Sequence, residues 1–115
     1  MSVARSWTLR YFAASTILFL VTGLMGAALR GSLADFGRMS DAMYYAMMTV
    51  HGLGAFLGWA GFAVMGASIW VLAKLGFEPR RVGVAMFAAT FWTFIVGVAL
   101  IVVSTLGMKF GGSWV

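Results

Sequence analysis

The single histidine of this sequence, His51, is the strongest candidate for chemistry, because it lies inside a long uncharged stretch. The local sequence at 49–54 reads TVHGLG. An ionisable side chain deep in an apolar segment is costly and usually serves a function, and neutral imidazole is the commonest metal ligand in proteins. The alternative interpretation is structural. In that case a neutral His51 is hydrogen-bonded to a neighbouring helix, for example through Thr49 or a backbone carbonyl.

Glycines follow His51 at helical spacing. If this stretch is helical, His51, Gly54 and Gly58 share one face. A pair of small residues four apart in an apolar helix is typical of close helix–helix packing. The other interpretation is that the glycines leave room for a flat macrocycle, because haem iron is often held by such a histidine. One histidine supplies one axial ligand, so a second ligand must come from outside this chain.

Two further polar residues lie toward the same end of their expected helices as His51. Arg30 ends the first apolar stretch and is interpreted either as an interfacial anchor or as a donor to a polar substituent at a cofactor edge. Tyr44 precedes His51 by seven residues, or two helical turns, and is by itself typical of a membrane-interface tyrosine.

Other catalytic machinery is missing from the sequence. It contains no Cys, and its only acids, Asp35, Asp41 and Glu78, fall in expected loops or at a helix start. The sequence therefore offers no cluster of metal ligands, no nucleophile with its base, and no membrane-embedded carboxylate. We expect that the chain by itself runs no reaction.

The elements that must position these residues are membrane helices. Uncharged stretches of 19, 32 and 27 residues separate Arg10 from Arg30, Asp41 from Lys74, and Arg81 from Lys109. A helix of about 20 residues crosses the hydrocarbon layer. The chain is 63% hydrophobic and 10% charged, against about 25% charged in soluble domains. This composition excludes a soluble globular enzyme and a disordered tail.

The sequence predicts an all-α membrane protein with three antiparallel transmembrane helices, at about 7–30, 42–75 and 82–107. The net charge of +5 does not indicate a nucleic-acid partner, because the basic residues sit at helix ends. The lipid bilayer is the expected partner, and Trp7, Tyr11 and Trp114 are interpreted as boundary aromatics. An excess of basic residues at one end predicts that the N-terminus lies inside; that end has Arg5, Arg10, Lys74, Arg80 and Arg81, and the other has Arg30, Arg38 and Lys109.

The pattern resembles the N-terminal part of subunit I of the haem–copper oxygen reductases, the cytochrome c oxidase type. A first helix ends in Arg30, and Tyr44 precedes a Thr-x-His-Gly motif at 49–52 near the outer end of a long second helix. Phe91-Trp92 lies in the first half of the third helix, and the segment 111–114, GGSW, matches the point where the family turns at the outer surface.

The resemblance implies that His51 is an axial ligand of the low-spin haem, with Gly52 and Gly54 beside it, and that Arg30 and Tyr44 lie near that haem. It also implies that the second axial histidine and the ligands of the copper and the high-spin haem belong to later helices. The chain would then be the first three helices of a larger bundle, and Val115 would not be a natural terminus. Electrons would come from cytochrome c or a quinol and reduce oxygen to water, with uptake and translocation of protons. The partners would be the remaining helices and the other oxidase subunits, in a prokaryotic plasma membrane.

One loop departs from the commonest family pattern. Many members have an Asp, with Asn residues nearby, at the inner loop where a proton pathway opens. The loop at 76–81 here reads GFEPRR, and two arginines beside Glu78 disfavour proton collection. A nitric oxide reductase-type subunit is therefore an alternative within the family. A small non-catalytic subunit of three helices, packed through Gly54 and Gly58, is the alternative outside it.

Overall fold

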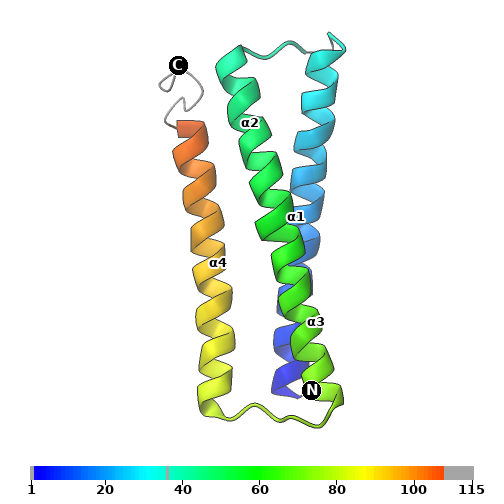
Figure 1. Cartoon of the computed structure of the whole chain (residues 1–115), viewed down its shortest axis with the longest axis vertical. Coiled ribbons are helices and arrows are strands. Elements are labelled where there is room, and N and C mark those ends of the chain that lie inside the picture. Colours follow the sequence, from blue (N-terminus) through cyan, green and yellow to red (C-terminus); the bar gives the residue numbers. More distant parts are fainter. Residues whose placement is uncertain (1, 36, 108–115) are drawn as a thin grey trace.

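The computed structural model describes residues 2–35 and 37–107, and these residues form three long helices with no strand among them (Figure 1). The first is α1 (Val3–Leu33). The second comprises α2 (Asp41–Leu53), a π-helix η1 (Gly54–Ala60) and α3 (Gly61–Lys74), and the third is α4 (Arg81–Gly107). Each of the three is long and apolar enough to cross a membrane. The predicted all-α membrane fold with three spanning helices is confirmed.

Local chemistry explains where the helices begin and end. The Ser2 and Ser40 hydroxyls cap α1 and α2 by accepting hydrogen bonds from the backbone N–H groups of Arg5 and Met43. At the end of α3, Gly76 has a φ of 81°. Its N–H donates to the Ala73 carbonyl at 3.2 Å, and the next N–H, of Phe77, donates to the Leu72 carbonyl at 3.0 Å. This glycine-terminated motif stops the helix and turns the chain toward α4.

The core is an aromatic cluster between α1, α3 and α4. Tyr11 and Phe62 are almost fully buried, with exposed fractions of 1% and 0%. The Phe91 ring from α4 lies edge-on to the Tyr11 ring at 5.2 Å between centroids. The Tyr11 hydroxyl donates a hydrogen bond of 2.8 Å to the Phe87 carbonyl, which ties α1 to α4. Trp7 and Tyr11 are thus bundle-core residues, and their position at the membrane boundary stays a prediction.

The second helix differs from its expected form. The sequence predicts one uninterrupted helix, whereas seven residues, Gly54–Ala60, are wound as a π-helix. This segment lies directly against α1, where the Ser15 hydroxyl donates a 2.9 Å hydrogen bond to the Trp59 carbonyl. A side-chain donor from a neighbouring helix can satisfy a carbonyl that the altered winding leaves available. The predicted helix bounds differ from those observed by at most four residues at the ends.

Candidate functional site

The site is built around His51, which α2 presents to α1. The Nδ1 atom of His51 lies 2.7 Å from the backbone carbonyl oxygen of Thr22. A carbonyl oxygen only accepts hydrogen bonds, so Nδ1 is the donor. In neutral imidazole this places the proton on Nδ1 and the lone pair on Nε2. The structure therefore anchors one ring nitrogen and leaves the other with the electronic character of a metal ligand.

Gly26 of α1 makes room for the His51 ring. A Cβ atom at position 26 would lie 2.8 Å from Cε1 of His51 and 3.3 Å from Nε2. Gly26 follows Thr22 by one helical turn, so a side chain there would stand beside the Thr22 carbonyl that His51 must reach. The absence of a side chain at Gly26 is what allows the ring to approach the backbone of α1.

The glycines after His51 divide into two groups. A Cβ at Gly54 would lie 2.9 Å from the Thr22 methyl group, and a Cβ at Gly58 would lie 3.0 Å from Cδ1 of Leu18. Both positions thus face α1 and allow a close approach of the helices, as the packing interpretation predicts. Gly52 is different. It is exposed, and a Cβ there would meet nothing within 4 Å, so open space lies beside it.

Arg30 and Tyr44 lie toward the end of the bundle that holds the α1–α2 loop. Arg30 is exposed in the last turn of α1. It follows Gly26 by four residues, so its Cα lies on the same face about 6 Å further along the axis. Tyr44 is half-buried and lines a shallow hollow with Ser32, at the end of α1, and Met39, in the α1–α2 loop. Among the described residues, no hydrogen bond joins Arg30 or Tyr44 to His51.

Two residues of α1, Thr22 and Gly26, complete the surroundings of His51 and are not predicted from the sequence. The available signal was the spacing of small residues, because Thr22 and Gly26 are four apart, like Gly54 and Gly58 on the second helix. Two such pairs in neighbouring helices predict a close crossing. The pairing of one particular carbonyl with His51 also depends on helix rotation, which the spacing leaves open.

The possible metal chemistry is restricted by the side chains at hand. Across residues 2–35 and 37–107, no three His, Cys, Asp or Glu side chains come together to hold a metal ion. His51 is therefore a donor of a single nitrogen. A single nitrogen could serve as one ligand of a metal that a macrocycle already holds, as in haem.

These features define a class of protein, an integral membrane protein in which an intramembrane histidine is oriented by the backbone of a neighbouring helix. The model of the family described as Cytochrome C and Quinol oxidase polypeptide I matches residues 6–115. Because the match covers nearly the whole chain, the chain belongs to this family, and the resemblance stated from the sequence is confirmed. Searches of the curated proteins and of the solved structures found no match. The GGSW segment at 111–114, Trp114, Lys109 and Val115 lie outside the described residues.

Proposed function

We propose that this chain forms the first three helices of subunit I of a respiratory terminal oxidase, and that His51 is one axial ligand of its low-spin haem. Membership of the family supports the general role. The 2.7 Å contact between Nδ1 of His51 and the Thr22 carbonyl is also what the structural interpretation of His51 predicts. It supports the ligand assignment because it leaves the lone pair of the neutral ring on Nε2. Metal-bound histidines usually donate their second ring N–H to a carboxylate or a backbone carbonyl, which fixes the tautomer and the ring orientation.

The residues around His51 fit a haem. The bound group would supply reversible one-electron chemistry, with a potential tuned by its axial ligands and its surroundings. The chain contributes orientation. The Thr22 carbonyl holds the Nδ1 proton, and Gly26 permits the approach of the ring. Apolar helices on either side lower the local dielectric constant and strengthen the hydrogen bond that orients the ligand.

The other proposed contacts follow from position. Gly52 borders open space next to His51, and this is where the proposal places part of the macrocycle. Gly54 contributes by holding the second helix close to Thr22. Arg30, one turn beyond Gly26 on α1, would donate to a polar substituent of the haem. Tyr44, two turns before His51, would lie nearer the outer edge of the same group.

The remaining parts of the proposed oxidase lie outside this chain. They comprise the second axial ligand, the copper and high-spin haem ligands, the other subunits and the electron donor, which is cytochrome c or a quinol. Oxygen would be reduced to water there, with uptake and translocation of inner-side protons. The spanning window of α4, within Arg81–Thr105, has none of its residues buried. This large apolar surface supports contact with lipid and with further helices.

The proposed setting is a prokaryotic plasma membrane with the N-terminus inside. Arg5, Arg10, Lys74, Arg80 and Arg81 lie at one end of the bundle, near the start of α1 and the α3–α4 loop. Only Arg30 and Arg38 lie at the other end among the described residues, and Arg38 is paired with Asp35 at 3.2 Å. The more basic end of a membrane protein normally faces the cytoplasm.

The decisive experiment replaces His51 by Ala in the complete subunit. This variant removes the single histidine of the chain, and with it the proposed ligand of the haem iron. The low-spin haem absorption bands should therefore be lost while the membrane helices remain. The measurement is the reduced-minus-oxidised visible spectrum of purified protein, with helix content followed by circular dichroism.

Thr49→Val is the matched control, because Thr49 lies in the same turn but its hydroxyl donates a 3.0 Å hydrogen bond to the Tyr45 carbonyl of its own helix. This variant should keep the spectrum. An unchanged spectrum in His51→Ala would refute the ligand assignment and would favour the non-catalytic role, with His51 serving only to join α2 to α1.

A further inference from the structure

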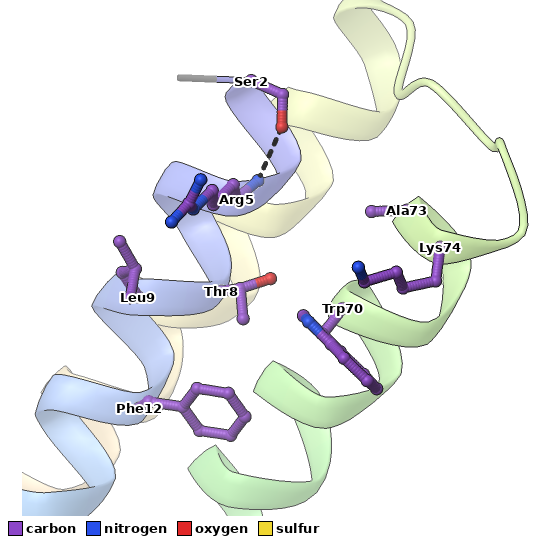
Figure 2. Close-up of a pocket in the computed structure, with 8 residues that line it drawn as sticks. All are labelled: Ser2, Arg5, Thr8, Leu9, Phe12, Trp70, Ala73 and Lys74. Carbon is purple, nitrogen blue, oxygen red and sulfur yellow. Dashed lines mark hydrogen bonds between the residues drawn. The ribbon is translucent and has the colours of Figure 1, made fainter.

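A groove of about 580 Å³ runs between α1 and α3, at the opposite end of the bundle from the α1–α2 loop (Figure 2). Figure 2 shows Lys74 and Trp70 reaching from α3 toward α1, with Phe12 opposite Trp70. The groove is lined by one face of each helix; its residues are Ser2, Arg5, Thr8, Leu9, Phe12, Trp70, Ala73 and Lys74.

The charge of the groove is positive and unbalanced. Arg5 and Lys74 line it, and no acidic side chain does. Glu78 is the one acid at this end of the bundle, and it lines a different hollow with Pro79 and Phe87. The Lys74 ammonium lies 5.7 Å from the centre of the Trp70 ring, which keeps the charge over the groove. The end of the groove lined by Arg5 and Lys74 therefore attracts an anion.

The groove changes from polar to apolar along the membrane axis. Phe12 follows Arg5 by seven residues on α1, which is about 10 Å deeper, and Trp70 lies about 6 Å deeper than Lys74 on α3. The deeper side chains are large and exposed, with exposed fractions of 38% for Phe12 and 50% for Trp70. A ligand that fits both parts has an anionic head at the level of the cations and a hydrocarbon chain that descends between the aromatic rings.

We propose that this groove binds an anionic phospholipid, with the phosphate at the end of the groove that Lys74 and Arg5 line and an acyl chain against Phe12 and Trp70. Both cations and the indole ring are at the depth of the membrane–water interface, where headgroups and tryptophan side chains normally lie. The occupant is thus supplied by the bilayer in which the three helices stand.

The test measures contact of lipid with Trp70 in the full-length protein. The protein is placed in phosphatidylcholine nanodiscs, and phosphatidylglycerol with brominated acyl chains is titrated in. The bromine atoms quench the fluorescence of nearby tryptophans. Because the chain has five tryptophans, the quenching of Trp70 is obtained as the difference between the wild type and Trp70→Phe. An interfacial cation contributes about a five-fold preference for anionic lipid. Arg5→Gln with Lys74→Gln should therefore raise the half-quenching fraction of phosphatidylglycerol about thirty-fold.

The matched control removes two cations from the same end of the bundle but outside the groove. Arg80→Gln with Arg81→Gln should leave the half-quenching fraction within about two-fold of the wild-type value. An equal loss in both double variants would overturn the proposal, because it would show attraction by general surface charge. Equal quenching by brominated phosphatidylcholine, or displacement of the lipid by free glycerol 3-phosphate, would also overturn it.

Discussion

At the scale of single residues, His51 is held by backbone rather than by another side chain. Its partner is the Thr22 carbonyl, and the ring fits because Gly26 has no side chain. A backbone acceptor cannot rotate away, as a serine or threonine hydroxyl can. The orientation of the imidazole ring thus depends on how closely α2 approaches α1, and this distance is controlled by small residues on both helices.

Gly26→Ala tests this dependence. The new Cβ would lie 2.8 Å from Cε1 of His51, so the ring or the helix must shift. Overpacking of this kind costs about 1–3 kcal/mol. We expect haem affinity to fall about ten-fold or more, with a shifted low-spin absorption band in the protein that retains haem. Gly23→Ala is the control, because a Cβ at Gly23 meets nothing within 4 Å. Identical spectra and affinities in the two variants would show that Gly26 has no positioning role.

At the scale of elements, the π-helix sets the rotation of α2 against α3. Gly54–Ala60 joins the part of the second helix that carries His51 to the part that carries Phe62. Phe62 must enter the aromatic core beside Tyr11, and His51 must face Thr22. Segments of π-helix frequently occur at functional sites. Regular α-helical winding would leave His51 and Phe62 only about 20° apart around the helix. The π-helix turns less per residue, so Phe62 reaches Phe91 and Phe94 of α4 while His51 faces α1.

Deletions within the π-helix test its role as one extra residue in the second helix. Loss of Ala55 alone would allow regular α-helical winding, and the shorter segment would turn through about the same angle as the π-helix does, so low-spin haem should be retained. Loss of both Ala55 and Phe56 would rotate α2 by about 100° relative to α3. With Phe62 fixed in the core, His51 would then turn away from Thr22, and low-spin haem should be lost while helix content by circular dichroism is retained. Haem loss after deletion of Ala55 alone would contradict this role.

The sequence predicts the elements well and their rotation poorly. Long uncharged stretches identify three helices because hydropathy reports depth in the membrane. The Ser2 cap is not predicted from the sequence, and α1 begins four residues before its predicted start. Hydropathy does not report which side of a helix faces its neighbour. For this reason the burial of Tyr11, which is only 1% exposed in the bundle, is not predicted from the sequence. The π-helix has the same apolar, glycine-containing composition as its α-helical neighbours, and nothing in its composition distinguishes it.

At the scale of the whole molecule, the three helices fix the depth of His51. It lies ten residues beyond the start of α2, about 15 Å along the helix axis from the end that carries the α1–α2 loop. The aromatic core and the cationic groove lie toward the other end. The direction in which the molecule stands in the membrane therefore decides which aqueous side is nearer to the proposed haem and which leaflet supplies the proposed lipid.

This orientation can be measured directly, because the sequence contains no cysteine and a single introduced thiol has no competitor. Ala34, at the end of α1, and Glu78, in the α3–α4 loop, are both exposed and lie at opposite ends of the bundle. With the N-terminus inside, a membrane-impermeant maleimide should label Ala34→Cys in intact cells, whereas Glu78→Cys should react only after permeabilisation. The Glu78 end is expected to face the cytoplasm because it carries the excess of basic residues. The reverse labelling pattern would place the more basic end outside, and it would put His51 nearer the cytoplasm.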